Sequence, residues 1–321
     1  MPNYTLIHLH SDYSLLDSTT KFERYVDWAV EQGMTSISSS EHGVLYNWTS
    51  KKEYCDKKGI KYIHGVELYL TEKLYHTRMK VTENKDKTYQ WNEVKQKQRD
   101  NYHIILLAKN YEGVKEINSL VSMANDDDHM YYKPRISFEE AANISDNVII
   151  SSACLASPLW SWKRTVMNYK AEIESIKTEI LQWQSDKEKF IAELNGETTV
   201  RKKKRKPELI EADIKKCDDY LHNLIINAEN ISFDMEDITF NINNKDKWFT
   251  KLFYRYDYLE VQPHVNSNDQ KEFNRWLLNM SRVYNKPIVC GTDTHSFDSY
   301  AAECRTIMQI AKGIEFLEED T

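Results

Sequence analysis

The sequence predicts an α/β fold, a barrel of mostly parallel strands with an inserted helical hairpin. Seven short apolar runs have the length of single strands, and segments with helical spacing separate several of them. Each run carries a residue that can bind a divalent metal or leads to one at its end; the run His103–Leu107 opens on its histidine. Such residues can serve one site only if the strand ends converge, as they do on one rim of a parallel barrel. The runs are Tyr4–Leu9, Thr35–Ser40, Ile60–Leu70, His103–Leu107, Asn147–Ser152, Tyr256–Gln262 and Pro287–Thr292.

Three helices are predicted among the N-terminal strands. The first is capped by Thr19 or Thr20 and ended by Gly33, and its apolar residues recur at helical spacing: Phe22, Tyr25, Val26, Ala29 and Val30. The second runs from residue 50 to 58 and the third from 112 to 125. Helices between continuous apolar strands indicate β-α units and a mostly parallel sheet. From Tyr256 to Ile310 the chain again alternates between strand and helix patterns.

Two segments interrupt this alternation. Residues 71–101 are polar and lack periodicity, so we expect a long excursion or lid. Residues 166–228 carry two narrow apolar seams joined near Gly196, which predicts an antiparallel helical hairpin. We interpret the hairpin as an insertion into one domain that comprises residues 1–321. The seams are formed by Tyr169, Ile173, Ile176, Ile180, Trp183, Phe190 and Leu194, and by Ile210, Ile214, Cys217, Leu221, Leu224 and Ala228.

The turn of this hairpin carries the basic run Arg201–Lys206. Three interpretations stay open: a solvated tip, contact with nucleic-acid phosphates, or a signal for a partner or for localisation. The net charge of −7 argues against a protein that binds nucleic acid over its whole surface, but a local basic patch can still contact single-stranded DNA.

Composition excludes several classes of protein. A hydrophobic content of 40% and a charged content of 29% are ordinary for a globular protein. The five cysteines are widely spaced without a C-x-x-C pair, which argues against a disulfide framework or a zinc ribbon. The sequence contains no 18-residue apolar window and no N-terminal signal pattern, so we expect a cytoplasmic protein.

The chemistry-bearing residues indicate a multinuclear metal site. His8 and His10 alternate along a strand, so both imidazoles face one side. Asp17 follows a short turn later, and Asp293 and His295 repeat the alternate spacing on the last strand. The alternative is a set of hydrogen-bonded core histidines and surface carboxylates. The other strand ends carry His42, Glu67, His103 and Cys154.

In this order the motifs resemble the PHP (polymerase and histidinol phosphatase) domain found at the N-terminus of bacterial DNA polymerase III alpha subunits. The resemblance covers residues 4–160 and 250–312 and implies a distorted seven-stranded β/α barrel, in a bacterial protein or a phage protein in a bacterial host. The motifs are His8-Leu9-His10-Ser11, Tyr13-Ser14-Leu15-Leu16-Asp17, Glu41-His42-Gly43, Gly65-Val66-Glu67-Leu68-Tyr69, His103-Ile104-Ile105-Leu106-Leu107-Ala108, Tyr131-Tyr132-Lys133-Pro134-Arg135-Ile136, Ser152-Ala153-Cys154-Leu155, Tyr258-Leu259-Glu260-Val261-Gln262 and Thr292-Asp293-Thr294-His295.

The resemblance implies nine ligands for up to three metals. His8, His10, Glu67 and Asp293 would hold the first; Glu67, His103 and Cys154 the second; and Asp17, His42 and His295 the third. Imidazole, carboxylate and thiolate ligands together suit Zn²⁺, Fe²⁺ or Mn²⁺ better than Mg²⁺. Two positions depart from the family: Glu41 stands where the family has Asp, and Ser18 where it usually has Gly.

Among these residues we expect Glu67 and Asp293 at the catalytic centre. Arg135 is our candidate for a phosphate clamp, with a surface ion pair as its alternative. Glu260 is expected to support a ligand or act as a base rather than bind metal itself.

Three functions follow from the resemblance. The favoured one is a metal-dependent phosphoesterase that acts as a 3′→5′ exonuclease on a single-stranded DNA end, beside replication. The second is a non-catalytic scaffold of a DNA polymerase III alpha subunit, and the third is a phosphatase of the histidinol phosphatase type. The sequence holds no polymerase palm, so we expect no polymerisation by this chain alone.

Overall fold

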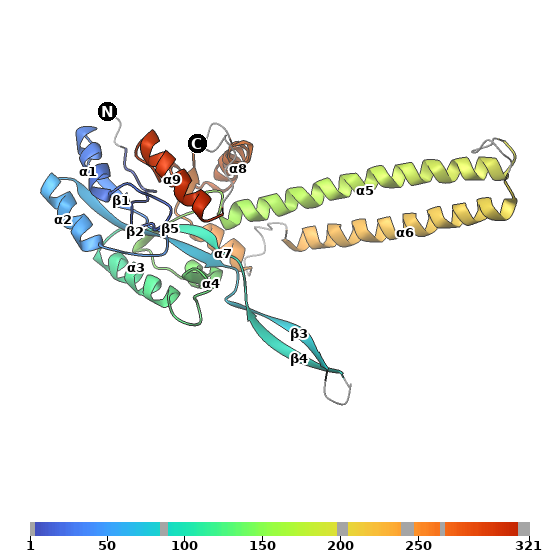
Figure 1. Cartoon of the computed structure of the whole chain (residues 1–321), viewed down its shortest axis with the longest axis horizontal. Helices are drawn as coiled ribbons and strands as arrows, with labels where there is room; N and C mark the ends of the chain where they lie inside the picture. The colour runs from blue at the N-terminus through green and yellow to red at the C-terminus, as the bar shows by residue number, and fades with distance from the viewer. Residues whose placement is uncertain (1–3, 84–88, 198–204, 239–246, 264–266, 314–321) are drawn as a thin grey trace. The chain divides into compact units, whose positions relative to one another are not determined.

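The computed structural model describes residues 4–83, 89–197, 205–238, 247–263 and 267–313. Contacts divide the chain into two compact units (Figure 1). One unit comprises Met1–Trp160 and Ile242–Thr321, and the other comprises Ser161–Asn241. None of the described helices has the length and apolar content needed to span a bilayer.

The main sheet of the first unit is centred on one long strand, β2. It pairs in parallel with β1 and with β6 and antiparallel with β5, which in turn pairs antiparallel with β7. A second, parallel sheet contains β8 and β9. The strands are β1 (Ser36–Ser39), β2 (Lys61–Thr71), β5 (Tyr102–Ala108), β6 (Arg135–Ser137), β7 (Val148–Ser151), β8 (Leu259–Val261) and β9 (Ile288–Cys290).

The fold is mixed α/β, but the predicted parallel seven-stranded barrel is not confirmed, because the described strands form separate sheets that do not close. The chain reaches β5 from β2 through a hairpin, and a hairpin reverses chain direction, whereas parallel pairing needs a long crossover. The predicted strand Tyr4–Leu9 is not continuous either. Leu6 makes a single bridge to Ile37, and Leu9 one to Thr294.

The three helices expected among the N-terminal strands are confirmed. They are α1 (Phe22–Glu31), α2 (Trp48–Lys58) and α3 (Tyr111–Ala124), and each begins within two residues of its expected start. Helix α1 buries one face against residues of β1 and α2 in a shared apolar core. The remaining helices of this unit are α4 (Phe138–Ala142), α7 (Trp248–Arg255), α8 (Asn268–Tyr284) and α9 (Ser299–Ala311).

The excursion expected at residues 71–101 is a two-stranded antiparallel hairpin of β3 (Tyr75–Glu83) and β4 (Tyr89–Lys97). It extends away from the main sheet (Figure 1). Its base is held by the segment that follows α3, since Tyr75 Oη donates to Asp128 at 2.9 Å and Lys97 Nζ to the Met130 carbonyl at 2.8 Å.

The second unit contains the long helices α5 (Pro158–Leu194) and α6 (Pro207–Ile238), which extend beyond the expected hairpin of 166–228 at both ends. They run antiparallel, because Trp183 stacks near Tyr220 while Lys187 pairs with Asp218. Part of the basic run, residues 201–204, lies outside the described residues. Arg205 pairs with Glu193 at 2.6 Å and with Asp213, so its charge is already engaged.

We expect a pH-dependent contribution to stability from His129. Its imidazole lies 2.7 Å from Asp126 and 2.8 Å from Glu140. Burial lowers the pKa of His129, but hydrogen bonds to Glu140 and Asp126 outweigh it and raise the pKa above 6.5. This stabilisation is therefore complete below about pH 6.5 and is lost as the pH rises through the folded-state value.

Thermal unfolding of His129→Gln against the wild type should show a difference in Tm at pH 6 that shrinks at alkaline pH. A difference that is constant across that range would contradict the assignment.

Candidate metal centre

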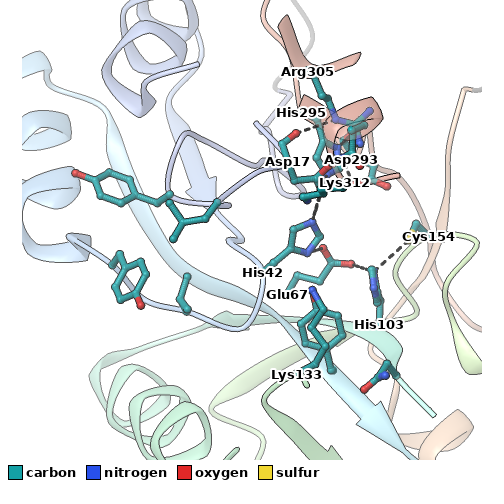
Figure 2. Close-up of a pocket in the computed structure, with 17 residues that line it drawn as sticks. Asp17, His42, Glu67, His103, Lys133, Cys154, Asp293, His295, Arg305 and Lys312 are labelled. Atoms are coloured by element: carbon teal, nitrogen blue, oxygen red, sulfur yellow. Dashed lines mark hydrogen bonds and ion pairs between the residues drawn. The ribbon is translucent and has the colours of Figure 1, made fainter. Parts of the chain in front are cut away.

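The predicted ligands converge on one pocket of about 590 Å³ in the first unit (Figure 2). His8 and His10 are fully buried and contact ligands that line the pocket. The pocket wall carries the other seven: Asp17, His42, Glu67, His103, Cys154, Asp293 and His295.

Backbone pairing explains this convergence. A bridge joins Leu9 to Thr294, and it sets His8 and His10 beside Asp293 and His295. A second bridge joins His42 to Glu67. Because β5 is antiparallel to β2, its first residues pair with the end of β2, and His103 lies opposite Tyr69. The reversed strand thus brings its N-terminal end to the site, where a parallel strand would bring its C-terminal end.

The first ligand cluster contains His8, His10, Glu67 and Asp293, whose ligand atoms all lie within 4.8 Å of one another. His8 Nε2 lies 3.0 Å from Asp293 Oδ1, and His10 Nε2 lies 3.0 Å from Glu67 Oε2. This group equals the set that the resemblance implied for the first metal.

The second cluster contains His42, Glu67 and His103. His103 Nδ1 lies 2.5 Å from Glu67 Oε1 and 3.6 Å from Cys154 Sγ. Relative to the implied set of Glu67, His103 and Cys154, the structure adds His42, whose Nδ1 lies 2.9 Å from Glu67 Oε2.

The third cluster contains His10, His42 and His295. Asp17, implied for this metal, contacts two of them: its Oδ2 lies 2.8 Å from His42 Nε2 and 3.0 Å from His295 Nε2. These two nitrogens are 3.4 Å apart. Figure 2 shows Asp17 and His42 pointing toward each other in the pocket wall.

The buried ligand atoms lack hydrogen bonds of their own. Within the described part of the chain, such atoms include the Nε2 atoms of His8 and His10, His42 Nδ1, both carboxylate oxygens of Glu67, and Asp293 Oδ1. Their nearest polar neighbours are one another, as in the contacts of Glu67 with His103 at 2.5 Å and of Asp293 with His8 at 3.0 Å, so they can be satisfied by protons shared between imidazole and carboxylate or by cations that both groups bind. Divalent cations would satisfy them together, and their mixed N, O and S chemistry suits transition metals. The residues therefore fit a metal site.

Electrostatics of the cluster agree with this fit. Burial raises the pKa of Glu67, but His103 and His42 outweigh it and hold the pKa well below its usual range. The pKa of Asp293 is likewise lowered, mainly by His8. Burial lowers the pKa of His42, yet Glu67 and Asp17 raise it to about 10. The carboxylates thus stay ionised and draw positive charge into the pocket, as protons on histidine or as metal ions.

The carboxylate of Glu260 orients the buried imidazole of His8. His8 Nδ1 lies 2.6 Å from Glu260 Oε1, which leaves Nε2 for the first cluster. Ser151 donates to the other Glu260 oxygen at 3.0 Å. Gly291 is required beside this carboxylate, because a Cβ there would lie 2.1 Å from Glu260 Oε1. Glu260 therefore orients the imidazole of His8, which is compatible with the expected role of supporting a ligand.

His10 is oriented by a buried network. Its Nδ1 lies 3.0 Å from Ser14 Oγ, which donates to Glu41 Oε2 at 2.6 Å. Lys51 Nζ, 2.6 Å from Glu41 Oε1, balances the charge of that carboxylate. Sequence reasoning noted Glu41 only as a departure from the family and missed Lys51. No local signal in the sequence marks Lys51, because its role depends on contact with the distant Glu41.

Arg135 does not act as a phosphate clamp in this structure. It is 0% exposed and does not line the pocket. Its guanidinium donates to the backbone carbonyls of Gln98 at 2.6 Å, Asp100 at 3.0 Å and His129 at 3.3 Å, so it joins the base of the β3–β4 hairpin to the sheet. The lysine and arginine side chains that line the pocket are Lys133, Arg305 and Lys312, which sequence reasoning missed.

Comparisons with known proteins relate this chain to one protein family. A family model, the PHP domain, matches residues 7–196. The DNA polymerase III alpha subunit of Treponema pallidum is 32% identical over 157 residues, which are 49% of this chain and 12% of that protein. The corresponding subunit of Aquifex aeolicus is 30% identical over 175 residues, or 54% of this chain and 14% of the relative.

Two solved structures also match with low similarity. One is assigned as a metal-dependent phosphoesterase from Bifidobacterium adolescentis, with 11% identity, a TM-score of 0.39, and coverage of 95% of this chain and 97% of that one. The other is an amidohydrolase from Chromobacterium violaceum, with 9% identity, a TM-score of 0.35, and coverage of 91% and 87%.

Proposed function

Because the chain belongs to the PHP domain family, we propose that it is a metal-dependent phosphoesterase that shortens single-stranded DNA from its 3′ end in a bacterial cytoplasm. One observation carries the proposal: buried imidazole and carboxylate atoms gather beside an open pocket, in groups whose ligand atoms all lie within 4.8 Å of one another. We propose two or three bound ions of Zn²⁺, Mn²⁺ or Fe²⁺.

When bound, divalent ions at such a site would supply positive charge for phosphoryl oxygens and would lower the pKa of water. The side chains of the protein prepare the site for that chemistry. Glu67 offers one oxygen to His10 and His42 and the other to His103, so it lies between two clusters. Lys133 and Lys312 line the pocket and add positive charge for an anionic substrate.

The second candidate is a scaffold in a larger replicative polymerase. The observation that favours it is coverage: the chain spans only about an eighth of the length of the curated relatives that it matches. A protein of this kind would keep the fold and the ligand residues without hydrolysing substrate. The histidinol phosphatase type of function is the third, and only a substrate panel separates it from the first.

We therefore expect metal-dependent shortening of labelled single-stranded DNA from the 3′ end. The panel contains single-stranded DNA, single-stranded RNA, duplex DNA and histidinol phosphate, with Mn²⁺ or Zn²⁺. His8→Ala and Asp293→Ala should abolish the activity, because each removes a ligand of the first cluster. Hydrolysis of histidinol phosphate alone would favour the phosphatase, and inactivity of metal-loaded protein on every substrate would favour the scaffold.

The panel also tests the basic run as a DNA contact. Replacing Arg201, Lys202, Lys203, Lys204 and Lys206 with alanine, while keeping the ion-paired Arg205, removes charge without breaking the pairs to Glu193 and Asp213. We expect weaker DNA binding with a smaller salt dependence and unchanged turnover of a small phosphate ester. Binding of DNA equal to that of the wild type would remove this segment from the proposal.

A further inference from the structure

Asp17 differs from the other ligands in how the fold holds it. Glu67 and His103 lie within paired strands, and His42 is anchored by a bridge to Glu67. Asp17 lies in a loop outside the named strands and helices, next to Leu16, whose φ of 62° is in the left-handed region. Leu15 and Leu16 are both exposed. The local chain therefore gives the Asp17 carboxylate little support.

That support comes from helix α9, near the other end of the sequence. Arg305, Gln309 and Lys312 follow one another at intervals of four and three, which places them on one face of the helix end, and all three line the pocket. Arg305 Nε donates to the Asp17 carbonyl at 2.8 Å, and Arg305 Nη2 donates to Asp17 Oδ1 at 3.0 Å. Gln309 Nε2 also donates to Oδ1. Figure 2 shows Arg305 next to Asp17.

In this arrangement the two carboxylate oxygens of Asp17 have different partners. Oδ1 accepts from both α9 side chains. Oδ2 is left to face His42 Nε2 at 2.8 Å and His295 Nε2 at 3.0 Å. Asp17 can thus offer one oxygen to a cation held with these histidines, in a direction set by three donated hydrogen bonds.

We propose that Arg305 and Gln309 are positioning residues for the metal site formed by Asp17, His42 and His295. The inference rests on the proposed function, since it requires that the cluster binds metal. Partners that orient a ligand typically contribute about 10–100-fold to metal affinity. Arg305 lies 288 residues from Asp17 and outside the region that the family model matches, so helix α9 completes a site whose ligand is contributed by the N-terminal loop.

Two physical effects of removing Arg305 have opposite signs. Loss of its charge would leave a more basic carboxylate and strengthen metal binding. Loss of its hydrogen bonds would free the Asp17 carbonyl, leave Oδ1 with Gln309 as its remaining donor from α9, and weaken binding. The Asp17 amide donates to the Ser14 carbonyl at 3.0 Å, which holds the backbone but not the carboxylate. The direction of the carboxylate depends on its α9 donors, so the second effect dominates and affinity falls.

The experiment measures the number and affinity of bound ions by titrating chelator-treated full-length protein with Co²⁺, followed by its visible absorption. The variants are Arg305→Ala and Gln309→Ala. The matched control is Arg24→Ala, which breaks the 2.7 Å pair between Arg24 and Asp298 at the opposite end of α9. We expect one Co²⁺ equivalent to bind about 10–100-fold more weakly in the first two variants, with the remaining equivalents and the control unchanged.

The outcomes separate this inference from the proposed function. Unchanged or tighter binding of every equivalent in Arg305→Ala would overturn the positioning role, and so would equal weakening of all sites, which indicates a general loss of structure. A wild-type protein that takes up less than one equivalent would instead overturn the metal site itself, and the inference with it.

Discussion

Glu67→Gln should remove most of the bound metal and abolish metal-dependent hydrolysis. Glu67 belongs to the first two clusters, and its two oxygens lie 3.0 Å from His10 Nε2 and 2.5 Å from His103 Nδ1. A glutamine has nearly the same shape but no charge, so the fold stays intact while both clusters lose their shared anion. The loss in affinity should exceed the roughly 10–100-fold cost of removing an outer partner.

Elemental analysis of purified protein after loading with Zn²⁺ or Mn²⁺ measures this effect. Glu116→Gln is the matched control, because Glu116 is a carboxylate outside the pocket lining that accepts from the Ser145 amide at 2.8 Å. Full metal content in Glu67→Gln would show that these ligands do not act through a common carboxylate.

Lys51→Met should destabilise the protein by about 3–5 kcal/mol, the usual cost of leaving a buried charge without its partner. Lys51 is 2% exposed and Glu41 is 1% exposed, and their charged atoms are 2.6 Å apart. Glu41 would retain only serine donors, from Ser11, Ser14 and Ser39. The double variant with Glu41→Gln should recover part of the loss, because it removes the unpaired charge.

Equilibrium urea unfolding measures these free energies. Lys52→Met, at the next position of α2, removes an exposed pair with Asp56 and should cost at most about 1 kcal/mol. A loss of that small size in Lys51→Met would mean that the Glu41 charge is compensated elsewhere. Since Ser14 links Glu41 to His10, Lys51→Met should also lower metal affinity at the first cluster.

Local patterns in the sequence predicted several helices and most of the candidate metal site. Apolar spacing located α1, because the 3.6-residue period is a property of the helix itself, and the helices predicted over residues 50–58 and 112–125 correspond to α2 and α3. Residue type and position at strand ends indicated a metal site, since few other side chains bind transition metals, and the resemblance to the PHP domain implied the set of nine candidate ligands. The same reasoning identified Glu260 as a support for a ligand, and the structure places it against His8.

The direction in which neighbouring strands pair could not be predicted from the sequence. An apolar run such as His103–Leu107 is compatible with pairing in either direction, and the direction follows from the connection before it. The β3–β4 hairpin occupies that connection, so β5 runs antiparallel to β2 and the expected parallel barrel is not confirmed.

The environment of individual cations was decided only by tertiary structure. Lys133 and Arg135 stand two residues apart, yet Lys133 lines the pocket while Arg135 is enclosed by three backbone carbonyls. Lys51 and Arg305 bear no local mark of function, because their roles depend on carboxylates far away in sequence, at Glu41 and Asp17. By itself the sequence determined which residues have the chemistry to bind metal. Only the packing of distant segments decided which side chains orient them, because an ion pair or hydrogen bond depends on separation in space and not on separation along the chain.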